Sequence, residues 1–115
     1  MEEWKKVNVL GTDYSIIQET KEERGKLSEV KDYDGCCDFT SKKIYVSDIS
    51  EDNGYMWDDN ITRFKHVVRH ELVHAFLFES GLTASSEWAE NEEIVDWIAL
   101  QLPKMAKLFE GIGVI

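Results

Sequence analysis

The chain carries the pentapeptide His70-Glu71-Leu72-Val73-His74 inside a run of residues that is typical of a single helix. Residues four positions apart lie on the same face of a helix, so the two imidazoles are placed to bind one metal ion together. Glu71 lies beside that metal, where its carboxylate can take a proton from a metal-bound water, as in zinc metallopeptidases. Because a chain of this composition contains the pattern by chance with odds of about one in a hundred, the flanking sequence has to supply further evidence.

The flanking pattern predicts a helix that begins at Ile61 or Thr62 and ends at Ser80. Asn60 or Thr62 is available to cap its start, and Gly81 is well suited to follow its end. Apolar side chains cover most of its circumference, so we expect a nearly buried helix at the centre of the domain. These side chains are Phe64, Val67, Val68, Leu72, Ala75, Phe76, Leu77 and Phe78.

A second helix is predicted from Glu87 through Leu102, after a connection over Leu82 to Ser86 in which Ser85 or Ser86 caps the helix. Pro103 removes a backbone hydrogen bond, so we expect a kink or restart there and a further helical segment to about Glu110. The expected inner stripe consists of Trp88, Ile94, Trp97, Ile98 and Leu102, with Trp88 and Trp97 in the core between the two helices.

Two histidines are too few for a catalytic zinc site, which needs three protein ligands and one open position. Acidic residues follow on the second helix, in the segment Asn91 to Asp96. Glu92 and Asp96 are four apart and share a face, so Glu92 can ligate the ion. Asp96 can then accept the free ring N–H of one histidine and fix its tautomer. Glu93 is the alternative third ligand.

HExxH followed by Asn-Glu-x-x-x-Asp resembles the gluzincin metallopeptidases. Small size and a start in two hairpins are similar to the ImmA/IrrE-like family and to related small zinc peptidases of bacterial phages and mobile elements. The resemblance covers Thr62 to Pro103. The chain departs from the family at Val95, where a small residue is usual. The family's Met-Pro ending is matched only in its proline, at Leu102-Pro103.

The resemblance implies a small zincin-like domain that binds Zn²⁺ through His70, His74 and Glu92, with Glu71 as general base. It also implies a protein or peptide substrate in extended form, paired with an edge strand above the active-site helix. Ile44 to Ser47 is the segment that we expect to form this strand, since strand addition reads the main chain and tolerates many side chains.

The first half of the chain predicts two hairpins. Val7 to Leu10 and Tyr14 to Ile17 flank Gly11-Thr12-Asp13, while Gly35 to Thr40 and Ile44 to Ser47 flank Ser41-Lys42-Lys43, with Ile44 and Val46 on one face and Tyr45 on the other. Thr20 to Glu29 is expected to be a loop or a short solvated helix, and Glu51 to Asn60 an exposed loop. Residues 1–115 are therefore expected to form a single α+β domain, in which a short antiparallel or mixed sheet of two hairpins packs on the HExxH helix and the glutamate helix.

Charge and cysteine content narrow the class of protein. The formal net charge of −10 disfavours a nucleic-acid surface, which needs clustered Lys and Arg. No segment is long and apolar enough for a membrane span, and none has the pattern of an export signal. Cys36 and Cys37 are adjacent, so a disulfide between them would be strained; we expect reduced thiols in a cytoplasmic protein. Buried free cysteines are expected in preference to soft zinc ligands or an inhibitory thiolate.

Several other residues are of types that could take part in a metal site or contact a substrate. His66 lies one turn before His70, but three imidazoles along a straight helix spread too far to surround one ion, so we expect His66 to be exposed or to pack on the helix surface. Tyr45, Tyr55 and Arg69 are candidates to stabilise an oxyanion. Trp57 is a candidate for substrate contact, and Asp58-Asp59 lacks the ligand spacing of a calcium loop.

The leading hypothesis is a cytoplasmic zinc endopeptidase that hydrolyses a peptide bond in a protein substrate, such as a regulatory protein. One alternative is a zinc-stabilised binding or regulatory module that does not cleave its partner. Another is a phage structural or accessory protein with a gluzincin-like fold. A pure binding module has no need of Glu71, so the presence of this residue favours catalysis.

Overall fold

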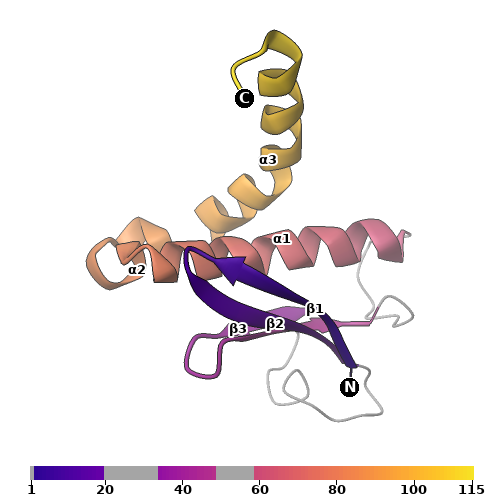
Figure 1. The fold of residues 1–115 in the computed structure, drawn as a ribbon, viewed down its shortest axis with the longest axis vertical. Helices are drawn as coiled ribbons and strands as arrows, with labels where there is room; N and C mark the ends of the chain where they lie inside the picture. Colours follow the sequence, from indigo (N-terminus) through magenta and orange to yellow (C-terminus); the bar gives the residue numbers. More distant parts are fainter. Residues whose placement is uncertain (1, 20–33, 49–58) are drawn as a thin grey trace.

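The computed structural model describes residues 2–19, 34–48 and 59–115, and has an α+β fold. A four-stranded mixed sheet covers one side of the long helix α1, and α3 crosses the other side of α1 (Figure 1). The predictions for Thr20 to Glu29, for Tyr55 and Trp57, and for most of Glu51 to Asn60 lie outside the described residues. The elements are β1 (Glu2–Val9), β2 (Thr12–Glu19), β3 (Gly35–Asp38), β4 (Lys43–Ser47), α1 (Asn60–Glu79), α2 (Leu82–Ser85), the 3₁₀ helix η3 (Glu87–Glu90) and α3 (Glu92–Ile112).

The first predicted hairpin is confirmed. β1 and β2 pair antiparallel, and Val9 pairs with Thr12, so the turn consists of Leu10 and Gly11. Both turn residues have positive φ, 50° and 97°, a combination that matches the right-handed twist of the flanking strands. The turn therefore begins one residue earlier than predicted, and Thr12 and Asp13 belong to β2.

The second predicted hairpin is also present, but its place in the sheet differs from our expectation. β3 and β4 pair antiparallel, and β4 also pairs with β2 in parallel, which gives the strand order β1-β2-β4-β3. Ile44 to Ser47 is therefore an inner strand, and the prediction that it forms the edge was wrong. A hairpin's own sequence does not determine which of its two strands joins the rest of the sheet; here the apolar strand does so, and β3 takes the edge of the sheet that the described residues form.

The main core lies between the sheet and α1. Ile44 and Val46 are fully buried, whereas Tyr45 between them is half-buried, so the predicted alternation along this strand is confirmed. The buried cluster contains Val9, Tyr14, Ile16, Ile44, Val46, Phe64, Val67, Val68 and Ala75. Burial of this face holds α1 rigidly across the sheet.

α1 begins slightly earlier than predicted. The side chain of Asp59 caps the helix by accepting from the backbone N–H groups of Ile61 and Thr62 at 3.0 and 3.1 Å, so the expected caps Asn60 and Thr62 were wrong. At the other end Gly81 has φ +88° and follows the last turn, as predicted.

A buried arginine joins the start of α1 to the second hairpin. Arg63 is only 1% exposed and donates to Asp34 Oδ1 at 3.2 Å, to Ser47 Oγ at 3.0 Å and to the Asp48 carbonyl at 3.0 Å. A buried guanidinium needs such partners, because burying a charge without them is costly. The network fixes the end of β4 and the residue before β3 against α1.

The second helix begins later than predicted. Glu87–Glu90 forms a separate 3₁₀ turn, and Asn91 caps α3 by accepting from the backbone N–H of Ile94 at 3.1 Å. Ser85 belongs to the short helix α2 and Ser86 lies in extended backbone, so neither is the cap of the long helix. An asparagine directly before two glutamates satisfies the first turn of α3 better than either serine could from five or six residues upstream.

α3 runs without a break past Pro103 to Ile112, so the predicted restart does not occur. Proline removes one hydrogen bond from the helix, but the turns on both sides of it keep theirs. Beyond Ala99 no described residue of this helix is buried, and its last turns stand away from the sheet and α1 (Figure 1). Within the described residues, no helix combines the length and the apolarity that a membrane span requires.

The predicted inner stripe of α3 was largely wrong. Trp88, Trp97, Ile94 and Leu102 are between 42% and 55% exposed. The buried positions are Val95 and Ala99, both 0% exposed, with the half-buried Ile98 beside them. Small side chains allow the two helices to approach closely, and Arg69 Nε donates to the Ala99 carbonyl at 2.7 Å across the contact. The positions that face α1 are thus occupied by small side chains, and the tryptophan rings lie outside the contact.

Candidate metal centre

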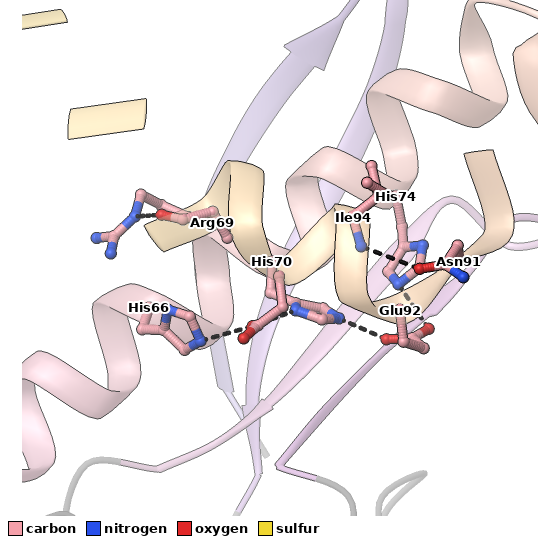
Figure 2. Close-up of polar contacts among 9 residues, drawn as sticks. His66, Arg69, His70, His74, Asn91, Glu92 and Ile94 are labelled. Atoms are coloured by element: carbon pink, nitrogen blue, oxygen red, sulfur yellow. Dashed lines mark hydrogen bonds and ion pairs between the residues drawn. The ribbon is translucent and has the colours of Figure 1, made fainter. Parts of the chain in front are cut away.

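Three histidines form one row on α1. His66, His70 and His74 follow one another at intervals of four residues and all are half-buried (Figure 2). Their ring centroids are 6.4 Å and 5.0 Å apart. The face of α1 that carries the row is turned toward the first turns of α3.

Glu92 of α3 reaches two of these rings. Its Oε2 lies 2.9 Å from His70 Nε2, and its Oε1 lies 3.0 Å from His74 Nε2. The three ligand atoms lie within 4.8 Å of one another, so the residues are placed to hold a metal ion. Glu93 belongs to no such cluster in the described part of the chain, and the geometry thus favours Glu92 as the third ligand.

Asp96 lies one turn further along α3, where it meets His70 from the other side. Its Oδ1 is 2.9 Å from His70 Nδ1, which is the contact predicted for a residue that orients a metal ligand. An ionised carboxylate accepts the Nδ1–H of the ring and thereby leaves Nε2 for a metal ion. The first turns of α3 therefore supply both the acid that would face a metal ion and the acid that contacts His70 from its other side.

His66 takes part in the same polar row, which the sequence analysis did not foresee. Its Nε2 lies 2.9 Å from Asp96 Oδ1, and its side chain is 12% exposed. His66 is therefore not exposed, as one of the two expectations had it, and it contacts an acid of α3 in addition to the surface of its own helix. The signal was present in the spacing: His66 stands to His70 as His70 stands to His74, and Asp96 stands one turn from Glu92.

Glu71 is buried on the side of α1 that faces β3. It is 7% exposed, and burial together with the charge of Glu92 raises its pKa to about 7, although His70 works in the opposite direction. A carboxyl group with a pKa near neutrality exchanges protons readily at physiological pH, as general acid–base catalysis requires. Gly35 leaves room for it: a Cβ on that residue would lie 3.1 Å from Glu71 Cγ.

His70 and His74 differ in their electrostatic surroundings. Burial lowers the pKa of His70, but hydrogen bonds to Asp96 and Glu92 and the nearby charge of Glu71 outweigh it, so the pKa of His70 is raised. For His74 burial dominates and its pKa is lowered. His74 is thus more readily neutral, which is the form that binds a metal ion, whereas His70 holds its second proton more tightly than an ordinary histidine does.

The two cysteines form no disulfide with each other, as expected, but both are half-buried and not buried. Cys37 lies on the α1 side of β3, and burial, together with the charge of Glu71, raises its pKa well above the usual range. A thiol of this kind stays protonated and is a poor metal ligand. Neither cysteine belongs to a metal-binding cluster in the described residues.

The oxyanion candidates find little support. Tyr45 alternates with the buried Ile44 and Val46 and so projects from the sheet face opposite to α1. Arg69 uses its Nε to hold Ala99 of α3, and Tyr55 lies outside the described residues.

Two imidazole nitrogens and one carboxylate oxygen are a ligand set that suits zinc. Comparisons of the chain with protein-family models, with curated proteins and with solved structures found no match. The residues of the cluster and their geometry are therefore what indicates a function for this chain.

Proposed function

We propose that the chain is a zinc-dependent endopeptidase of the gluzincin type, which hydrolyses a peptide bond in a protein substrate. The observation that carries this proposal is the position of Glu92, with one carboxylate oxygen at each of His70 Nε2 and His74 Nε2. Two metal ligands on one helix and a third on an antiparallel neighbour leave the fourth position of a tetrahedral ion available to water or substrate.

His70, His74 and Glu92 would hold the zinc ion, which when bound supplies a Lewis acid and lowers the pKa of water toward neutrality. Glu71 takes a proton from the attacking water and then delivers it to the leaving amine. Burial of Glu71 and its pKa near 7 support this role, because the group must both accept and release a proton. Asp96 keeps His70 in the required tautomer.

The arrangement of the sheet supports an extended peptide as substrate. β3 is the last strand in the order β1-β2-β4-β3, and it passes next to Glu71 at Gly35. A peptide added to β3 would gain main-chain hydrogen bonds and place one of its peptide bonds near the proposed base. This role replaces the one expected for Ile44 to Ser47.

The decisive experiment uses protein loaded with one equivalent of zinc and a mixture of peptides from unfolded proteins, with new amino termini identified by mass spectrometry. We expect cleavage by the unaltered chain and a loss of about 10²- to 10⁴-fold in Glu71→Gln, which should retain its zinc. Glu93→Gln is the matched control and should cleave normally, because Glu93 is exposed and outside the cluster.

Cleavage by Glu71→Gln at the normal rate would assign the base to another residue. If the unaltered, zinc-loaded chain cleaves none of the peptides, the alternative of a zinc-stabilised binding module is favoured.

A further inference from the structure

We propose that the chain has a second divalent-cation site, formed by His66, His70 and Asp96, one helical turn away from the first. We call it the turn-shifted site. It deepens the proposed function by adding a means of metal inhibition, but the binding of the second ion can be tested whether or not the chain cleaves peptides.

The turn-shifted site follows from the antiparallel packing of α1 and α3. His74 faces Glu92 (Figure 2). His66 faces Asp96, and His70 lies between the two acids. The second set of ligands lies one turn earlier on α1 and one turn later on α3 than the first set. It has the same composition, two imidazoles and one carboxylate.

The geometry of the second set is as compact as that of the first. Asp96 Oδ1 lies 2.9 Å from His66 Nε2 and 2.9 Å from His70 Nδ1, and the three ligand atoms lie within 4.8 Å of one another. The His66 and His70 side chains are 12% and 16% exposed, while that of Asp96 is 42% exposed. Two nearly buried rings that converge on one accessible carboxylate give an ion both firm ligands and a path from solvent.

An ion in the turn-shifted site has no general base at the position that corresponds to Glu71. Glu71 follows His70 in the sequence, but the residue that follows His66 is Val67, which is buried in the core and carries no polar group. An ion bound one turn away therefore meets an apolar side chain where the first ion meets a carboxyl group, and we assign no hydrolytic role to it.

The two sites share His70, so they are coupled. An ion in the first site binds His70 Nε2, so a second ion has to bind His70 Nδ1. The proton on Nδ1 then leaves to solvent, and Asp96 exchanges its hydrogen bond with that proton for a bond to the second ion. Two dications on opposite nitrogens of one ring would lie about 6 Å apart, and their repulsion alone makes the second ion on the order of a hundredfold weaker even in water; loss of the ring proton weakens it further. Under the proposed function, zinc in excess should therefore inhibit by removing Asp96 from its orienting role.

The test is a zinc titration of the full chain, in which calorimetry measures the affinities and native mass spectrometry counts the bound ions. The chain contains three histidines, and all of them belong to the row, so histidine variants separate the sites cleanly. We expect two ions on the unaltered chain, with affinities at least about a hundredfold apart. His66→Gln should bind only the tighter ion. The exposed neighbour variant Lys65→Gln, as matched control, should still bind two ions.

His74→Gln distinguishes this proposal from the proposed function, because it should lose the first site and keep one ion on His66, His70 and Asp96. An anomalous diffraction map of unaltered crystals soaked in excess Co²⁺ provides a check that needs no variant, with the second peak expected between His66 and Asp96. The proposal is overturned if the unaltered chain binds only one ion. It is also overturned if His66→Gln still binds two ions, as would occur if the cysteines bound the second.

Discussion

Gly35 of β3 lies directly against Glu71 of α1: a Cβ at residue 35 would come within 3.1 Å of Glu71 Cγ and within 2.6 Å of Val67 Cγ1. The edge strand and the proposed general base are therefore as close as the backbone allows. Any side chain at this position has to push β3 away from α1, because the valine is held by the core.

We expect Gly35→Ala to lower the free energy of unfolding by about 1–3 kcal/mol, since it overpacks the contact between β3 and α1. Urea unfolding followed by circular dichroism measures the change. Gly111→Ala is the matched control: a Cβ there meets nothing within 4 Å, and the residue lies inside α3, so alanine should raise stability by about 0.5–1 kcal/mol. Equal effects of the two substitutions would show that β3 is free to move off the helix.

Metal retention should depend on Glu92 and hardly at all on Glu93. Glu92→Gln replaces an anionic ligand by a neutral amide between His70 and His74, so its zinc affinity should fall at least a hundredfold, whereas Glu93→Gln should stay within a few-fold of the unaltered chain. Competition with a chromophoric chelator at one equivalent of zinc gives both constants. The reverse order would move the third ligand by one position, and a complete lack of zinc binding would remove the metal centre altogether.

Glu71 should make the chelated protein less stable as the pH rises. Its pKa is about 7 in the folded chain and 4.5 ordinarily, so the folded state binds the proton more tightly than the unfolded state. The resulting stabilisation is fully present below pH 4.5 and is lost as the pH rises through 7, a change of about 3 kcal/mol.

Glu71→Gln removes this titration, and its stability in EDTA should fall less steeply between pH 5 and pH 8. Urea unfolding at a series of pH values compares the slopes, with Glu93→Gln as a control that keeps the original slope. Parallel curves for Glu71→Gln and the unaltered chain would mean that the carboxyl is solvated and already ionised at pH 5.

Substitutions on α3 should distinguish the observed inner face from the one predicted by periodicity. Trp97 is 55% exposed, so Trp97→Gln should change stability by no more than about 0.5 kcal/mol. Val95 is fully buried between the helices, and Val95→Ala should cost about 1–3 kcal/mol. Thermal unfolding of the two variants side by side is sufficient. If Trp97→Gln lowered stability strongly and Val95→Ala did not, Trp97 and not Val95 would belong to the core.

The elements that could be predicted from the sequence are those that depend on local pattern. Alternation around Tyr45 predicted a strand with Ile44 and Val46 on its buried face, and the four-residue spacing of His70 and His74 placed both rings on one side of a helix. The same spacing predicted that Glu92 and Asp96 share a face of the next helix, and both acids do lie against His70. Backbone periodicity alone determines such relationships.

Tertiary packing decided the rest. The sequence pattern placed acids on one face of the second helix and Trp97 on another, but only contact with α1 determined that Val95 and Ala99 are buried and Trp97 is not. Likewise, only the pairing of β2 with β4 placed β3 at the edge, and only the antiparallel approach of two helices brought His66 to Asp96. Periodicity states which residues share a face, whereas the free energy of packing the whole chain selects which face is buried and against what.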